Sequence, residues 1–531
     1  MSFTEYDIAI CGIGFILPGG IDTPEGFDQL KQQGNTLIQD FRVEFHDATE
    51  KEIFRCGYIE DIYKFSYKEF GLTKKQASLM DPQQRILLKL SKKALKDAGI
   101  DTPSTGNRIG AFFATGINYY LFDNLLKNSV EDTEFDIHNI IRLNDSTFAA
   151  TRIASTLGLQ GPAISVQSAC SSSVSAIHVG CQSILSGESE MALVGACSLL
   201  LPQHRRFTCR DGDILAHDGI CRPLDIAATG TVASSGGAVF LLRTAQSAIK
   251  SGSKIYAIIK ATSLNNDGGG KSSFGAPSIF GQKTVIEEGL SIANINANQL
   301  SYHELHGTAT ILGDLIEMES TSSAFSLSAK DSVALGAIKS QIGHTDTASG
   351  LFGIINSIYS LVHRCVPPIA NFRQLNPKIT PFITGFSNLY QQSQLSNAEM
   401  LFGSISSFGI GGTNGFVVLA VNNACLGWQT PYPEYHWEEE QECYIPLKIA
   451  KQIILTPLQP ESTEQLTDIF ILDILEKLLG EEIKDTTLNF YDMGGDSILL
   501  LDFIDILKKK TGTTLPLNAL ISSPTISELV N

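Results

Sequence analysis

The sequence predicts a large mixed α/β unit followed by a small all-α unit. Strand-like apolar runs such as "DIAICGIGF", "RIGAFFATG" and "MALVGACSLL" alternate with helical stretches, which is typical of a mixed α/β core with largely buried strands. Near residue 422 this alternation gives way to prolines, aromatics and acidic residues without a period. Amphipathic helical patterns follow after residue 460. We therefore expect an α/β unit at 1–422, a linker at 423–460 and a helical bundle at 461–531.

Composition excludes several classes of protein. The 531 residues exceed one typical domain, and 43% of them are hydrophobic, enough for a large core. A net charge of -17 argues against nucleic-acid binding. We find no membrane-length apolar run, no signal-peptide layout and no paired spacing among the ten cysteines. The expectation is a cytoplasmic protein with no membrane partner, no disulfide framework and no metal site.

The first strand and the first long helix can be read directly. The strand at 7–15 contains Gly12 and Gly14, but Pro18 blocks the helix that a dinucleotide-binding motif requires. Residues 75–100 have apolar side chains at helical spacing and end at a glycine. We expect a buried strand and an amphipathic helix, and no nucleotide site.

A cysteine lies between a strand-like run and a cluster of serines in "VQSACSSSVSAIH". If "AISVQSA" is a strand and "SSSVSAIHVGCQSIL" a helix, Cys170 lies at the N-terminus of that helix. The unpaired N–H groups and the helix dipole there favour a thiolate, so we expect a lowered thiol pKa. The alternative is a buried structural thiol, since free cysteine is commonly part of the core.

Histidines accompany small residues in two further segments. "HELHGTATILGDLIE" contains His306, and "AIKSQIGHTDTASGLFG" contains Lys339 and His344. Neutral imidazoles can donate hydrogen bonds to a developing enolate and take part in proton transfer. The Gly-rich "SSFGIGGTNGF" can supply backbone N–H groups to an oxyanion hole. Each segment taken alone also fits a purely structural role.

Together these segments, with "MDPQQRILL", resemble the β-ketoacyl synthase (ketosynthase) family in order and spacing. The resemblance covers about residues 5–422 and is greatest to the ketosynthases of modular polyketide synthases. It implies a thiolase-like fold, in which two pseudo-symmetric α/β halves form five layers, and a homodimer. It also explains the small residues around Cys170, which let a phosphopantetheine thioester reach the sulfur.

The resemblance also implies site residues. Its catalytic residues are Cys170, His306, His344 and Lys339. The cysteine accepts the acyl group, the histidines promote decarboxylation and stabilise the enolate, and the lysine supports the histidines. The N–H groups of Cys170 and Phe408 form the oxyanion hole, and Thr308 and Thr310 contact the pantetheine arm.

Three segments depart from the family pattern. The usual "HGTGT" reads "HGTAT", which places Ala309 near the site. The usual "GEG" segment reads "ASSGG" at 233–237, and "TNAH" reads "TNGF" with Phe416 at its end. None of these changes removes the catalytic triad, so we expect an active enzyme with altered substrate choice.

The last 71 residues resemble a phosphopantetheine carrier domain. In "FYDMGGDSILLLDF" the serine Ser497 follows Asp496 at the start of an amphipathic helix. By itself this pattern fits a helix N-cap equally well. The resemblance implies covalent 4′-phosphopantetheine on Ser497, attached by a phosphopantetheinyl transferase. Because "GGDS" also occurs in peptidyl carriers, both an acyl carrier and a peptidyl carrier remain open.

The resulting hypothesis is a ketosynthase–carrier didomain, an acyltransferase that performs decarboxylative Claisen condensation. The sequence contains no "GHSxG" acyltransferase motif, so we expect a trans-acting acyltransferase to load a malonyl-type extender. Other expected partners are acyl carrier proteins and further synthase modules. Two alternatives stay open: acyl transfer without elongation, and a non-catalytic dimeric scaffold that presents the carrier.

Overall fold

A computed structural model provides the structure of the chain. It describes residues 4–43, 52–100, 108–129, 137–203, 214–387, 389–445 and 474–476. The chain divides into two compact units, 1–447 and 448–531. Ser497 and nearly all of the expected helical bundle at 461–531 lie outside the described residues, so the architecture below is that of the first unit. None of the helices in the described ranges has the length and apolar character needed to cross a membrane.

Within the described residues, eleven strands pair into one large mixed sheet that contains two similar halves. The first half comprises, in spatial order, β1 (Ile8–Ile16), β8 (Gly236–Thr244), β7 (Met191–Ser198), β5 (Ile109–Thr115) and β6 (Ala163–Ser165). The second comprises β9 (Ala257–Asn266), β16 (Thr413–Asn422), β15 (Met400–Phe408), β10 (Leu300–Glu304), β11 (Val333–Gly336) and β13 (Phe386–Ser387). A short antiparallel pairing of β1 with β9 joins the halves.

Strand direction shows an internal duplication. In the first half, β1–β8 and β8–β7 are antiparallel while β7–β5 and β5–β6 are parallel. In the second half, β9–β16 and β16–β15 are antiparallel while β15–β10 and β10–β11 are parallel. What repeats is the order of antiparallel and parallel strand pairs. Many different apolar residues can occupy the same buried strand position, so the repeat does not require similar sequences. The duplication is therefore not readable from the sequence itself.

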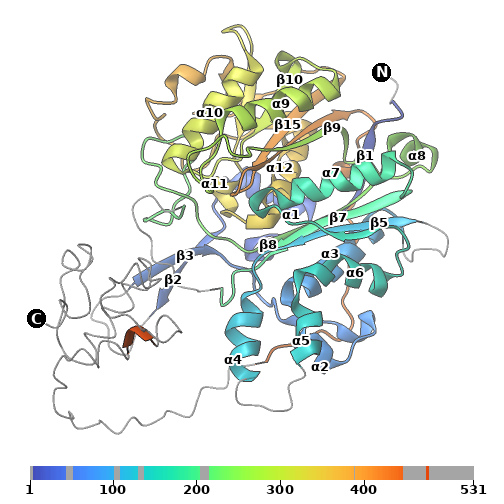
Figure 1. Ribbon diagram of the computed structural model, residues 1–531. Coiled ribbons are helices and arrows are strands. Elements are labelled where there is room, and N and C mark those ends of the chain that lie inside the picture. The colour runs from blue at the N-terminus through green and yellow to red at the C-terminus, as the bar shows by residue number, and fades with distance from the viewer. Residues whose placement is uncertain are drawn as a thin grey trace, which may run out of the picture. The chain divides into compact units, whose positions relative to one another are not determined.

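Helices complete five layers (Figure 1), which confirms the expected thiolase-like architecture. The central layer consists of α7 (Ser172–Leu185) and α12 (Ser349–His363), which contact strands of both halves. The first half is covered by α3 (Pro82–Asp97) and α6 (Ala149–Leu157). The second half is covered by α9 (Ile279–Ala293), with α10 (Ile311–Phe325) packed against α9.

The remaining elements lie outside the large sheet and the helices described above. The helices are α1 (Pro24–Gln33), α2 (Lys74–Leu79), α4 (Leu126–Ser129), α5 (Ile137–Asn144), α8 (Ala245–Lys250) and α11 (Lys339–Ile342). The strands are β2 (Ile38–Val43), β3 (Glu52–Gly57), β4 (Lys64–Phe65), β12 (Cys365–Val366), β14 (Ser393–Gln394) and β17 (Gln441–Glu442).

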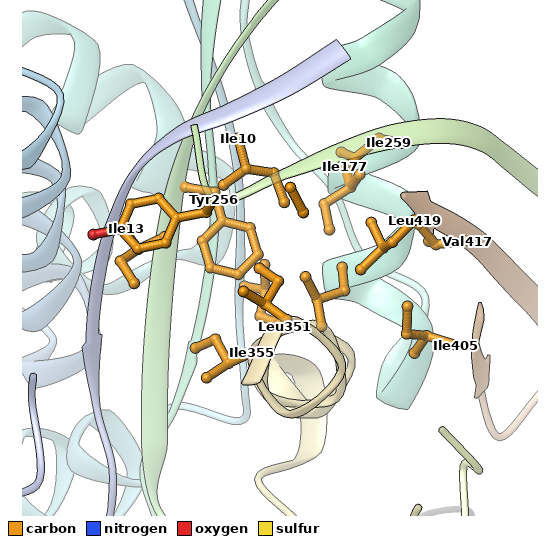
Figure 2. Packing of buried hydrophobic residues seen from close by; sticks show 14 of the residues in the cluster. Ile10, Ile13, Ile177, Tyr256, Ile259, Leu351, Ile355, Ile405, Val417 and Leu419 are labelled. Carbon is orange, nitrogen blue, oxygen red and sulfur yellow. The ribbon is translucent and has the colours of Figure 1, made fainter. Parts of the chain in front are cut away.

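The main core surrounds the central helices. Figure 2 shows side chains of β1, β9, β15 and β16 meeting those of α7 and α12. Thirteen of the fifteen residues of α12 are buried, from Ser349 to Leu361, as expected for a helix enclosed by protein on all sides. This packing holds the N-terminal ends of both central helices, where the candidate site lies, in fixed positions.

The two glycines of β1 serve packing. A Cβ atom on Gly12 would lie 2.1 Å from the carbonyl oxygen of Ala94, and one on Gly14 would lie 2.3 Å from that of Leu90. Both carbonyls belong to α3. The glycines therefore allow the strand and the helix to approach closely, which accounts for them without a nucleotide.

Residues 423–445, which we call the strap, differ from the expected linker because they pack against the first unit. The Trp428 ring makes edge contacts with Phe27 and Tyr359, and its Nε1 donates to Asp28 at 2.8 Å. Cys443 is fully buried. The strap packs on surfaces made by other elements, so its aromatic residues show neither helical nor strand-like spacing. The rest of the proposed linker, 446–460, lies outside the described residues.

We predict that Trp428→Ala destabilises the first unit by about 3–5 kcal/mol, because the indole is buried among aromatic rings and a cavity would remain. Thermal and denaturant unfolding of the full chain will measure the loss. Phe280→Ala, which removes an aromatic ring that is 78% exposed, is the control and should change stability by less than about 0.5 kcal/mol. Equal stability of both variants would show that the strap is not part of the folded unit.

Candidate active site

Cys170 lies in a tight turn between β6 and α7. The turn is a short 3-10 segment, Ala169–Ser171, that leads directly into the helix. Ala169 has φ +52°, a left-handed conformation that is uncommon for a residue with a side chain. Serine hydroxyls close the turn, since Ser172 Oγ donates to the Ala169 carbonyl at 2.6 Å and accepts from the Ser168 N–H at 2.8 Å. The serine cluster is thus explained by the turn that presents the sulfur.

The second half of the fold holds the backbone of the nucleophile. The Cys170 carbonyl accepts hydrogen bonds from Ser349 Oγ at 3.2 Å and from Ser407 Oγ at 3.1 Å. Ser349 begins α12 and Ser407 lies on β15. The turn therefore depends on both halves.

The thiol pKa is raised, contrary to the expectation from its place at a helix start. Burial has the largest effect and, with the negative charge of Asp346, raises the Cys170 pKa to about 12. The charge of Lys339 and the N–H groups of Ile410 and of Cys170 itself oppose this shift without overcoming it. The expected lowered pKa is wrong because loss of solvation outweighs the field of the helix terminus.

His306 lies on a loop that α10 holds through carboxylates. Glu317 accepts from the N–H of His306 at 2.6 Å and from that of Gly307 at 2.8 Å. Asp314 accepts from the Ala309 N–H at 2.9 Å. Sequence reasoning missed both acids, although an Asp-x-x-Glu pattern directly after a Gly/Thr-rich loop is a readable signal for side chains that bind loop N–H groups.

Lys339 supports the same loop from the other side. Its Nζ donates to the His306 carbonyl at 2.5 Å. It is buried, and burial lowers its pKa while the carboxylates of Glu304 and Glu317 oppose that shift. The expected contact between the lysine and a histidine segment is therefore present, through the backbone of His306.

His344 is held between two strand-like hydrogen bonds and carries a defined tautomer. Its N–H donates to the Val232 carbonyl at 2.7 Å, and its carbonyl accepts from the Ser234 N–H at 3.1 Å. The "ASSGG" segment, which departs from the family pattern, thus fixes this histidine. Nδ1 accepts from the Asp346 N–H at 3.0 Å, which leaves the proton of the neutral ring on Nε2.

The two imidazoles meet edge to face as neutral rings. Their centroids are 5.7 Å apart and their planes are inclined by 85°. Burial and the positive charge of Lys339 hold the pKa of both His306 and His344 well below the usual range. Both rings are therefore uncharged at neutral pH and can donate or accept a hydrogen bond.

The glycine-rich turn after β15 lies beside the site. The ring of Phe408 is buried and lies 5.7 Å from that of His306. Of the N–H groups in this turn, that of Ile410 acts on the Cys170 thiol and lowers its pKa. The Phe408 N–H stays the oxyanion-hole donor that the motif predicts, and the Ile410 N–H is a second candidate donor from the same turn.

The remaining predicted residues surround the loop of His306. Thr308 and Thr310 are partly exposed, with their hydroxyl oxygens 3.1 Å apart. Ala309 has φ +58°, and its fully buried methyl packs in a small cluster with Cys221 and Val232. Phe416 is fully buried and lies against His303. Two of the departures from the family pattern, Ala309 and Phe416, are thus accommodated by packing.

Comparison with known proteins places the chain in a family. Residues 5–248 match "Beta-ketoacyl synthase, N-terminal domain", 256–373 match "Beta-ketoacyl synthase, C-terminal domain" and 470–531 match "Phosphopantetheine attachment site". The chain belongs to the β-ketoacyl synthase family, in the group of polyketide synthase ketosynthases. It also carries a phosphopantetheine attachment domain, which confirms the expected cofactor.

Particular relatives agree with this assignment. The chain is 34% identical over 440 residues to a phenolphthiocerol/phthiocerol polyketide synthase protein of Mycobacterium tuberculosis, covering 79% of this chain and only 29% of that longer relative. Ketosynthase twelve of the bacillaene polyketide synthase of Bacillus amyloliquefaciens has 32% identity and a TM-score of 0.72, covering 79% of this chain and 74% of the other. A module 1 bacillaene ketosynthase of the same species has 31% identity and a TM-score of 0.69, covering 78% and 76%.

Within the described residues, no group of three or more His, Cys, Asp or Glu side chains is arranged to hold a metal ion.

We predict that alkylation of Cys170 by iodoacetamide accelerates about tenfold per pH unit between about pH 7 and pH 9, without a plateau. The reason is that the thiolate is the reactive form and its fraction keeps rising until the pH reaches the thiol pKa. Peptide mass spectrometry will follow the modified residue, with Cys170→Ala as the control for site assignment. A plateau below about pH 8 would show that the helix terminus does lower the pKa.

Proposed function

We propose that the first unit catalyses decarboxylative Claisen condensation between an acyl group on Cys170 and a malonyl-type extender bound to a carrier. The observation that carries the proposal is the pair of neutral imidazoles, His306 and His344, whose centroids are 5.7 Å apart. Asp346 links this pair to the Cys170 thiol, since its N–H donates to His344 and its carboxylate accepts from the thiol. Acyl transfer alone needs a nucleophile and an oxyanion hole. Two uncharged histidines add what decarboxylation requires, which is stabilisation of an enolate.

Loading begins at the nucleophile, which lies in the first half of the fold, and also uses groups of the second half. Cys170 Sγ attacks the thioester carbon of the incoming acyl group, and the N–H groups of Cys170 and of Phe408 or Ile410 hold the oxygen that becomes negative. The acyl group then stays on Sγ, and the incoming thiol leaves.

Condensation uses the second half. His344 donates from Nε2, because its Nδ1 is occupied by the Asp346 N–H. His306 faces it and donates to the same developing enolate oxygen as CO2 leaves. The charge of Lys339 nearby keeps both rings neutral and favours negative charge in the pocket. The enolate carbon then attacks the acyl-cysteine carbonyl.

The carrier domain supplies the second substrate site in this proposal. Ser497, within the matched range 470–531, holds the 4′-phosphopantetheine after action of a phosphopantetheinyl transferase. The thiol of that group carries thioesters and lets them reach the pocket. The extender comes from an acyltransferase outside these 531 residues, because no acyltransferase motif occurs within them.

Pairing with a second copy is also part of the proposal. β6 lies at one end of the large sheet, and its Ile164 is 47% exposed. The adjacent short helix at 146–148 adds Phe148, which is 37% exposed. An unpaired strand edge beside apolar side chains is suited to self-association, which supports a homodimer.

We predict that His306→Ala and His344→Ala acquire an acyl group on Cys170 yet lose condensation by roughly 10²–10⁴-fold, since loading does not require the imidazoles. Intact-protein mass spectrometry will measure loading, and CO2 release from a malonyl-loaded carrier will measure condensation. Cys170→Ala should show no acyl group on the first unit.

Three outcomes separate the hypotheses. Wild-type loading without CO2 release would indicate acyl transfer without elongation. Absence of loading in the wild-type protein would indicate a non-catalytic scaffold. Wild-type condensation rates in either histidine variant would overturn the histidine assignment.

We predict that malonylation of the carrier requires an added acyltransferase. The holo protein will be mixed with malonyl-CoA, with and without a free-standing acyltransferase. Mass spectrometry will then measure the mass of the carrier fragment. Ser497→Ala is the control and should stay unmodified in both reactions. Efficient malonylation without the added enzyme would reveal a loading activity within this chain.

A further inference from the structure

A carboxylate touches the nucleophile in the pocket. Cys170 Sγ donates to Asp346 Oδ1 at 3.8 Å, within hydrogen-bond distance for sulfur. The other oxygen, Oδ2, accepts from Ser198 Oγ at 3.4 Å. Both carboxylate oxygens are therefore engaged, one by the thiol and one by a hydroxyl that orients the group.

The backbone around Asp346 is arranged to place this carboxylate. Asp346 has φ +47°, in the left-handed region that most side chains avoid. Its N–H donates to His344 Nδ1 at 3.0 Å. The same residue thus fixes the tautomer of one histidine and directs its side chain to the sulfur. Such uncommon backbone conformations concentrate at functional positions.

Acyl loading requires an acceptor for the proton of the Cys170 thiol. A neutral thiol is a weak nucleophile, and the proton must leave Sγ as the new C–S bond forms. The other ionisable groups of the pocket are poor acceptors. The imidazoles have strongly lowered pKa values, and Lys339 donates to the His306 carbonyl. Among the described residues, only Asp346 accepts a hydrogen bond from the thiol.

We propose that Asp346 is the catalytic base of acyl loading and passes the Cys170 proton to the departing thiol, a step that rests on the condensing function proposed above. Asp346 Oδ1 takes the proton from Sγ while Sγ attacks the thioester carbon. When the incoming C–S bond breaks, the same proton moves from Asp346 to the leaving sulfur. One C–S bond forms, one breaks, and the carboxylate is regenerated.

The two pKa values set the timing of this transfer. Burial raises the pKa of Asp346 above its usual range, which makes it a stronger base than an exposed carboxylate. The thiol pKa, about 12, is higher still. The proton therefore moves together with C–S bond formation and not before it.

Two rates measured on the full-length Asp346→Asn variant test the proposal. Removing the negative charge lowers the thiol pKa, so alkylation of Cys170 by iodoacetamide should become faster than in the wild type. Removing the base should slow acyl loading of Cys170 from a short acyl thioester by roughly 10²-fold. Opposite changes in the two rates are the expected result, and Asp346→Glu should recover part of the loading.

Other outcomes overturn the proposal in distinguishable ways. Faster alkylation with equal or faster loading would mean that the carboxylate only suppresses the thiolate. Slower alkylation with slower loading would mean a structural role. If the wild-type protein does not load, the condensing function itself fails, whereas wild-type loading that persists in Asp346→Asn overturns the base role alone.

Folding and charge are controlled separately. Cys197 is fully buried, so its alkylation in any variant reports unfolding. Asp331→Asn removes a partly exposed carboxylate and should change neither rate. Ser198→Ala keeps the charge but releases Oδ2, so loading should fall a few-fold with alkylation unchanged. That variant decides the question if Asp346→Asn does not fold, and unchanged loading in it would then overturn the proposal.

Discussion

The site depends on the close approach of α7 and α12 at their N-terminal ends. The Gly350 N–H donates to Ser173 Oγ at 3.1 Å, and a Cβ on Gly350 would lie 2.7 Å from a methyl carbon of Val174. A larger residue at this contact would separate the helices. The turns that precede them, which carry Cys170 and Asp346, contact each other as a result. Small side chains at one helix contact thus set the distance between nucleophile and carboxylate.

Internal duplication explains why these two turns meet. Each half of the sheet leads into one central helix through a 3-10 turn with a left-handed residue, Ala169 in the first half and Asp346 in the second. A pseudo-twofold relation brings equivalent helix starts together. The first half then supplies the sulfur, and the second supplies the carboxylate and the imidazoles.

Much of this could be predicted from local pattern. The buried strands, the helix after Cys170 and the two histidine loops follow from short sequence segments whose side chains act on their own backbone. The orientation of the strand pairs and the packing of the strap could not be predicted, because both depend on partners far along the chain. The raised thiol pKa was missed for the same reason, since its main cause is burial by the folded chain and its second cause, Asp346, lies 176 residues from Cys170. The effect of the Ile410 N–H on the thiol could not be predicted either, because it depends on the conformation of a glycine-rich turn.

The hydrogen bonds that hold the Cys170 carbonyl also determine when the Cys170 turn can form during synthesis of the chain. Ser407, one of the two donors, lies 237 residues beyond Cys170, and the strap that covers the first unit comes later still. A ribosome adds roughly 5–20 residues per second. Cys170 is therefore made many seconds before Ser407, which holds its carbonyl. A partly made chain therefore lacks a hydrogen bond that holds the turn of Cys170. The geometry of the Cys170 turn is thus set only after β15 has been made.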